Sequence, residues 1–170
     1  MTEATGSLRI GIDARKLVDF GIGTYLWNLI EELGRIDKRN TYLLYHQHSA
    51  PAELPKASRR QWIWDGTPKY SLQEQLTLPW HGWHDKLDLL HCPHWVMPLL
   101  PTCPTVVTIH DLIHLALPRR RSTLEQSYAR FMIGHAVRRA RRIVTVSEFS
   151  RQDLIERAGA RPEQVVVIPI

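Results

Sequence analysis

Two titratable side chains, His110 and Asp111, stand side by side directly after the apolar run of residues 105–109. A histidine can donate a hydrogen bond to a substrate hydroxyl or carry a proton, and an aspartate at a strand end can orient that histidine or bind a sugar hydroxyl. A structural role is also open, in which Asp111 caps the following turn and His110 is a hydrogen-bonded residue at a strand end. His114 adds a third titratable group one helical turn later. These residues are the first candidates for catalysis.

A glycine-containing stretch, Gly21-Ile22-Gly23-Thr24, follows the first predicted strand. It lacks the third glycine of a dinucleotide-binding fingerprint and the Gly-Lys-Ser/Thr ending of a Walker A loop, so no cofactor is expected. Glycines at this position still allow the backbone to approach a phosphate where a helix begins, although a plain tight turn explains them equally well. Gly21 and Gly23 are therefore candidates for phosphate binding.

Neither a metal centre nor a serine hydrolase site is predicted. Histidine pairs with ligand-like spacing occur, but no HExxH helix or second-shell acids accompany them, and no Gly-x-Ser-x-Gly elbow is present. The pairs are His91 with His94 and His110 with His114. The two cysteines, Cys92 and Cys103, each stand beside a proline and are expected to be reduced thiols, because neither a disulfide framework nor a CxxC pair is available.

Three tryptophans, Trp80, Trp83 and Trp95, occur in a proline-containing stretch between the third and fifth predicted strands. Aromatic faces suit sugar rings and apolar acceptor groups. More often such side chains anchor loops onto the core, and this interpretation is preferred here.

Alternating strands and helices surround these residues. Apolar periodicity predicts a helix that begins near Ile22 and stops at Gly34. A second helix follows a capping box at residues 122–125, and a third begins at Ser147 or Ser150 and ends at Gly159. The predicted strands are residues 8–13, 41–45, 61–64, 87–91, 105–110, 143–147 and 165–168.

Near-continuous apolar strands between helices predict an α/β fold, a doubly wound parallel sheet of the Rossmann-like type. In such sheets ligands bind outside the carboxyl ends of the strands, where helices begin. Polar, small or titratable residues collect at that edge, namely Asp13 with Arg15, Gly21 with Gly23, His91 with His94, His110 with Asp111, and Ser147 with Glu148. The site is therefore expected there.

Length and composition are consistent with one domain over residues 1–170, because the chain is 44% hydrophobic and carries enough apolar residues for a single core. No segment is long and apolar enough to span a bilayer, and the first residues lack the pattern of a signal peptide, so a cytoplasmic location is expected.

The excess of positive charge, +5 over the whole chain, is concentrated in the basic segment of residues 119–142. It contains eight arginines and a single acid, Glu125: Arg119, Arg120, Arg121, Arg130, Arg138, Arg139, Arg141 and Arg142. A solvated helix face with a surface loop explains this pattern, and so does contact with a phosphorylated substrate, nucleic acid or an anionic membrane. Peripheral contact with the inner face of a membrane is retained as a hypothesis.

Taken together and in this order, these stretches resemble the N-terminal domain of the family 4 glycosyltransferases, which have the GT-B fold. The resemblance covers most of the chain from Leu8 to Ile170, except residues 46–69. The matching segments are RIGIDARKL with GIGTYLWNLIEEL, YSLQEQLTLP, DLLHCPHWVMPL, PTVVTIHDLIHL, RRARRIVTVSEFSRQDLIE and VVVIPI.

The resemblance implies transfer of a sugar from a nucleotide donor to an acceptor, with retention of the anomeric configuration and without a metal. It places Gly21 and Gly23 near the donor diphosphate, where Arg15 can add to the positive field. Ser147 and Glu148 match the turn that opens a helix at the same cleft. A departing diphosphate requires positive charge or N–H donors, which helix N-termini supply.

The remaining assignments concern the sugar and the partners. His110 matches a strand-end histidine near the transferred sugar, and Asp111 is a hydroxyl contact beside it. The expected partners are a nucleotide-sugar donor and a carbohydrate or lipid-linked acceptor, with no nucleic acid. The family's nucleotide-binding second domain has no counterpart here. This acceptor-side domain is therefore expected to need a C-terminal GT-B domain, in cis or as a separate chain.

Two other functions stay open. The chain could be a non-catalytic scaffold or regulatory half of a glycosyltransferase complex, in which case His110 carries no chemistry. It could also be a basic nucleic-acid-binding module, although it lacks a recognisable reading motif.

Overall fold

A computed structural model describes residues 6–47, 59–113 and 123–169 of the chain. The described part contains a seven-stranded sheet in the order β3-β2-β1-β4-β5-β6-β7, with every neighbouring pair parallel. The strands are β1 (Arg9–Asp13), β2 (Thr41–His46), β3 (Arg60–Trp64), β4 (Leu89–Cys92), β5 (Thr105–Thr108), β6 (Arg142–Thr145) and β7 (Val165–Val167).

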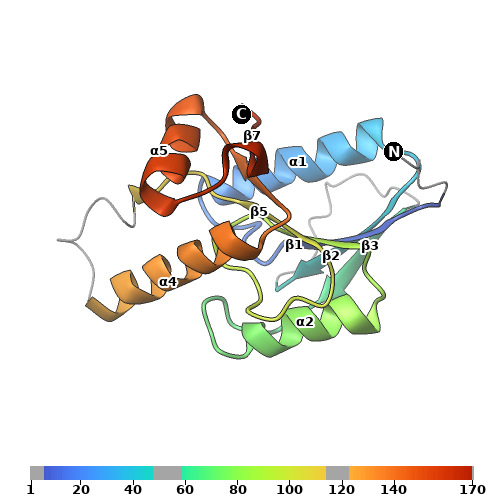
Figure 1. Ribbon diagram of the computed structural model, residues 1–170. Helices are drawn as coiled ribbons and strands as arrows, with labels where there is room; N and C mark the ends of the chain where they lie inside the picture. Colours follow the sequence, from blue (N-terminus) through green and yellow to red (C-terminus); the bar gives the residue numbers. More distant parts are fainter. Residues whose placement is uncertain (1–5, 48–58, 114–122, 170) are drawn as a thin grey trace.

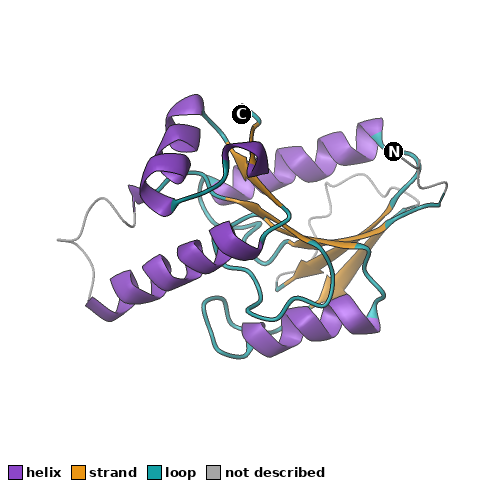
Figure 2. Cartoon of the chain, in the orientation of Figure 1, coloured by secondary structure: helices purple, strands orange, loops and turns teal. Residues whose placement is uncertain are grey.

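Helices cover both faces of the sheet, as Figures 1 and 2 show. They are α1 (Ile22–Ile36), α2 (Glu74–His84), α4 (Thr123–Arg139) and α5 (Glu148–Ala158). On one face, Leu26 and Ile30 of α1 pack with β1 and β2. On the other face, Leu78, Met132 and Leu154 bring α2, α4 and α5 into one hydrophobic cluster. The predicted doubly wound α/β fold is confirmed.

A strand is present at each predicted position, with small differences in the ends. The fifth strand ends at Thr108 instead of His110, and the sixth ends at Thr145 instead of Ser147. His110 and Ser147 therefore lie in the loops that leave the sheet. This is where side chains can turn toward a ligand, because the residues of a strand are committed to its two faces.

The prediction that the first helix stops at Gly34 is wrong, since α1 continues to Ile36. An added Cβ on Gly34 would lie 1.3 Å from an Arg60 guanidinium nitrogen. This glycine therefore makes room for a side chain of β3 and does not end the helix. The predicted limits of the last helix are confirmed: Ser147 accepts a hydrogen bond from the Ser150 N–H at 3.1 Å, and Gly159 has a φ of 73°. Ser122 of the predicted capping box lies outside the described residues.

The tryptophans divide into two groups. Trp95 is buried in the core, as expected for a residue that anchors a loop. Trp80 and Trp83 lie on α2 with exposed side chains, so the anchoring role predicted for them is wrong. Cys92 and Cys103 are both free thiols, as predicted. None of the helices in the described part of the chain is long and apolar enough to cross a membrane.

Candidate functional site

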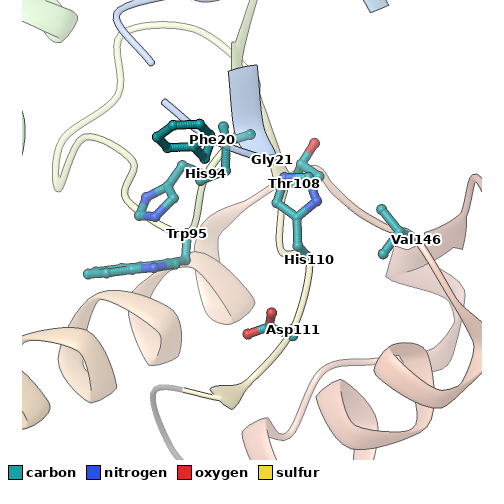
Figure 3. A pocket seen from close by; sticks show the side chains of 9 residues that line it. Phe20, Gly21, His94, Trp95, Thr108, His110, Asp111 and Val146 are labelled. Atoms are coloured by element: carbon teal, nitrogen blue, oxygen red, sulfur yellow. The ribbon is translucent and has the colours of Figure 1, made fainter. Parts of the chain in front are cut away.

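A pocket of about 320 Å³ opens at the carboxyl edge of the sheet (Figure 3). It lies where the loops after β1, β4, β5 and β6 meet, as the fold predicts for a ligand site. Its lining residues are Phe20, Gly21, Ile22, His94, Trp95, Thr108, His110, Asp111 and Val146. Segments far apart in the chain therefore share one cavity, and Gly21 and His110 both line it.

The imidazole of His110 is held by its surroundings on two sides. The ring lies edge-on to Tyr25 of α1, with the two centroids 4.9 Å apart, and is hydrogen-bonded to the backbone of Pro93. The proline carbonyl can only accept, so the bonded ring nitrogen, Nδ1, carries the hydrogen. Nε2 has no hydrogen-bond partner among the described residues. In neutral His110 this nitrogen is therefore a buried acceptor that the described residues leave unused.

Burial lowers the pKa of His110 below its ordinary value, although Pro93 and the charge of Asp111 oppose the shift. The lowered pKa favours the neutral imidazole near pH 7. A neutral ring suits contact with sugar hydroxyls, because it avoids placing a fixed positive charge beside a carbohydrate.

Thr108, the last residue of β5, connects three elements behind the pocket. Its Oγ1 lies 3.0 Å from the Tyr25 hydroxyl and 2.8 Å from Nε2 of His91. Burial lowers the pKa of His91 to about 4, so this histidine is neutral at physiological pH. The three side chains tie α1, β4 and β5 together two residues before His110 in the chain.

Asp111 lies at the exposed rim of the pocket. Its Oδ1 accepts a hydrogen bond from the Ile113 N–H at 3.0 Å. This is the turn-capping role that the sequence left open, and Asp111 combines it with a position on the pocket wall. His114, the third titratable group of this segment, lies outside the described residues.

The two glycines of the predicted loop have different structural roles. Gly21 has a φ of 73°, lines the pocket and directly precedes α1, which has no side-chain cap. An added Cβ on Gly23 would lie 2.4 Å from the carbonyl oxygen of Leu17. Gly23 therefore allows a close backbone contact that positions the loop, whereas Gly21 faces the cavity.

The start of α5 is fixed to the loop of His110. The Ser150 hydroxyl donates to the His110 carbonyl at 2.9 Å, and the Ser147 hydroxyl lies 3.0 Å from that of Ser150. Ser147 directly follows the pocket-lining Val146 in the chain, so these hydrogen bonds help to fix that wall of the pocket. Glu148 is largely exposed and pairs with Arg151 at 2.7 Å, away from the lining residues.

Arg15 lies inside the protein, two residues after the end of β1. Its side chain is 2% exposed, and its Nη2 is 2.7 Å from Asp13 Oδ2 and 3.2 Å from Glu74 Oε2. Burial alone would lower the pKa of Arg15, but the hydrogen bonds and charges of these two carboxylates raise it above its ordinary value. The guanidinium is therefore committed to an internal ion-pair network, and Arg15 is not among the lining residues.

Sequence reasoning did not connect Phe20 with the site. This residue follows Asp19, precedes Gly21 and is fully exposed at the pocket. Figure 3 shows Phe20, His94 and Trp95 on the side of the pocket away from His110 and Val146. Its position directly before Gly21 is a usable signal, since an aromatic side chain beside a candidate binding loop can pack against a ligand.

The ring of His94 is held by a series of hydrogen bonds that the sequence does not reveal. Its Nε2 lies 3.0 Å from the Tyr70 hydroxyl, to which Nζ of Lys16 donates at 2.6 Å. Tyr70 has a φ of 60°, unusual for a bulky residue and often found near functional sites. No group of three His, Cys, Asp or Glu side chains within the described ranges is arranged to hold a metal ion.

Several solved structures have a similar architecture. HepE from Anabaena, crystallised with UDP, has a TM-score of 0.57 at 17% identity, over 96% of this chain and 43% of that one. A glycosyltransferase from Rickettsia africae has a TM-score of 0.53 at 12% identity, over 97% of this chain and 43% of that one. Sucrose-phosphate synthase from Thermosynechococcus elongatus has a TM-score of 0.53 at 14% identity, over 95% of this chain and 88% of that one. These likenesses show the class of fold, an α/β Rossmann-like fold that matches GT-B glycosyltransferases.

The sequence itself identifies the family. The family model for Glycosyltransferase Family 4 matches residues 21–170. The chain therefore belongs to Glycosyltransferase Family 4, and the family resemblance described above is confirmed. It spans less than half the length of HepE, of which it covers 43%. No match to a curated protein was found.

Proposed function

We propose that this chain is the acceptor-side domain of a retaining glycosyltransferase that uses a nucleotide-sugar donor. In this proposal it works with a C-terminal GT-B domain, in cis or as a separate chain, that binds most of the nucleotide. The supporting observation is the pocket itself, because the chemically distinct loops of Gly21 and His110 meet in it at the edge of the sheet where ligands bind.

The proposal gives each side of the pocket a different task. Gly21 and the start of α1, which has no side-chain cap, receive the donor diphosphate, because the positive end of the helix dipole favours negative charge. Negative charge grows on the diphosphate as the sugar departs, so this positive helix end stabilises the transition state more than the ground state. Gly23 contributes by shaping the loop, through its close contact with Leu17.

His110 is proposed to bind the hexose through Nε2, and Asp111 to bind a hydroxyl of the sugar or the acceptor at the rim. Ser147 fixes the loop of His110 through Ser150, and the start of α5 with Glu148 faces the second domain. HepE was crystallised with UDP and glucose. That structure supports a uridine nucleotide sugar as the donor class to test first.

Arg15 is proposed to act on the site indirectly. Its charge neutralises Asp13 and Glu74 at the carboxyl edge of the sheet. Without it, two uncompensated carboxylates at this edge would make the local potential more negative, and an anionic donor would be repelled. The guanidinium thus keeps the local potential suitable for an anionic donor without touching it.

A substitution at Gly21 tests the assignment of the diphosphate site. With the second domain of a Family 4 enzyme supplied and UDP-glucose as the donor, Gly21→Ala is expected to raise the donor KM about tenfold, because a Cβ obstructs the charge-assisted hydrogen bonds from the backbone. Gly159→Ala is the matched control. Both glycines have a φ of 73° and open space around them, but Gly159 ends α5 and does not line the pocket.

Equal KM values for the two variants would contradict the assignment. Absence of donor hydrolysis and sugar transfer by the wild-type pair, over a panel of nucleotide sugars, would favour the scaffold alternative.

Contact with an anionic membrane surface also belongs to the proposal. Arg130, Arg138 and Arg139 of α4 are exposed, as are Arg141 and Arg142 after it. Arg119, Arg120 and Arg121 lie outside the described residues. Cationic side chains near a surface of anionic lipids attract it electrostatically. The acceptor compatible with this placement is a lipid-linked one.

A further inference from the structure

Helix α2 exposes large apolar side chains on the face that points away from the sheet. Leu76, Trp80 and Trp83 are 74%, 50% and 71% exposed, and their spacing of four and three residues places them on one side of the helix. Leu72, just before the helix, is 84% exposed. The opposite face of α2 is buried, with Leu78 in the core. We call Leu72, Leu76, Trp80 and Trp83 the α2 stripe.

Helix α4 lies in the same layer as α2 and adds to this surface. The Tyr128 hydroxyl of α4 contacts Glu74 of α2, and both helices pack on the same side of the sheet, as Figure 1 shows. Their outward faces therefore point the same way. On α4 that face carries Leu124 and Phe131, which are exposed together with Arg138.

Among the side chains of α2 and α4 that the structure describes, the exposed charged ones are arginines. The only acidic residue in the sequence of α2 is Glu74, and it is buried against Arg15. Helix α4 ends with Arg138 and Arg139 in its last turn. The combination of exposed tryptophan, leucine and phenylalanine with arginine is typical of surfaces that lie in a membrane interface. Indole rings suit that region because their ring is apolar and their N–H is polar.

We propose that the α2 stripe, with Leu124 and Phe131 of α4, docks this domain onto an anionic lipid bilayer. The apolar side chains enter the boundary between headgroups and acyl chains, and Arg138 and Arg139 bind lipid phosphates. This assigns most of the inserting surface to α2, which lies outside the basic segment that first suggested membrane contact, and adds two apolar side chains from within that segment.

The docked orientation places the pocket beside the bilayer. Helices α2 and α4 begin at the carboxyl edge of the sheet, and the stripe starts there with Leu72. The ring of pocket-lining Trp95 lies 6.0 Å from that of Tyr128, in the first half of α4. An acceptor anchored in the bilayer therefore reaches the pocket without leaving the lipid. This last step rests on the proposed transferase function, whereas docking itself does not.

Vesicle co-sedimentation of the 170-residue chain tests the proposal. We expect binding to equimolar phosphatidylcholine and phosphatidylglycerol vesicles, weaker binding to phosphatidylcholine alone, and weaker binding at high salt. Trp83→Ser and Leu76→Ser are each expected to lower the partition coefficient roughly tenfold. The matched control is Trp64→Ser. Trp64 is 65% exposed but lies on β3 on the same side as Trp62, which packs against the α1 cluster.

A second pair of variants separates the electrostatic contribution. Arg138→Gln is expected to weaken binding to the anionic vesicles several-fold, and Arg35→Gln on α1 to leave it unchanged. Circular dichroism establishes that each variant is folded. Quenching of wild-type tryptophan fluorescence by brominated lipids tests insertion without any substitution.

Three outcomes overturn the proposal: no binding of the wild-type chain to anionic vesicles, equal loss of binding in Trp64→Ser and Trp83→Ser, or a self-associated wild type that Trp83→Ser converts to a monomer without affecting lipid binding. The last result would assign the stripe to a second copy of the chain. No donor is present in these measurements, so they succeed or fail independently of sugar transfer.

Discussion

Replacing His110 with alanine is expected to lower kcat for sugar transfer about 100-fold or more when the chain works with its second domain. The physical reason is that His110 lines the pocket and its buried Nε2 has no partner among the described residues, so the substrate is its expected partner. Steady-state kinetics with UDP-glucose measures the effect. A change of less than about threefold would favour the scaffold alternative, in which this histidine performs no chemistry.

The pH dependence distinguishes a direct role of His110 from a structural one. Burial lowers its pKa, so protonation of Nε2 and loss of its acceptor capacity occur at a lower pH than for a free histidine. Activity of the wild type should therefore persist through the ordinary histidine range and fall only at more acidic pH. His110→Gln keeps a polar side chain but does not titrate, so the acid limb of its profile should be absent.

Replacing Arg15 with methionine is expected to destabilise the fold by about 3–5 kcal/mol. The guanidinium is 2% exposed, and the substitution leaves Asp13 and Glu74 without their shared counter-ion. Burial already raises the pKa of Glu74, with Arg15 opposing the shift, so loss of Arg15 should raise it further. Urea denaturation measures the change in the free energy of unfolding.

The double variant Arg15→Met/Glu74→Gln should recover part of this loss, because the second substitution removes one uncompensated charge. Arg35→Met is the control, since Arg35 forms an exposed pair with Glu32 on α1, and its unfolding midpoint should not move. If the Arg15 variant unfolds at the same urea concentration as the wild type, the ion-pair network does not hold the carboxyl edge together.

The fold could be predicted from the sequence because local and long-range signals agree. Apolar runs such as residues 105–109 and 165–168 indicate parallel strands buried on both faces, and the glycine loop and Ser147 mark helix starts. Gly34 was misleading, because a glycine that makes room for Arg60 looks the same in sequence as one that ends a helix. Only tertiary packing distinguishes the two.

The candidate site was predictable to the level of the sheet edge but not of individual contacts. Parallel strands bring their carboxyl ends together, so Gly21 and His110 could be expected to meet. Arg15 could not be placed, because its partner Glu74 lies 59 positions away and periodicity does not report such pairs. The exposure of Phe20, Trp80 and Trp83 could not be predicted either, because large apolar side chains are normally expected to be buried.

A crystal structure of the chain with its second domain and a bound nucleotide sugar is the decisive experiment. We expect the diphosphate against the backbone of Gly21 and a hexose hydroxyl within hydrogen-bond distance of Nε2 of His110. A donor bound with neither Gly21 nor His110 in contact with it would refute both assignments.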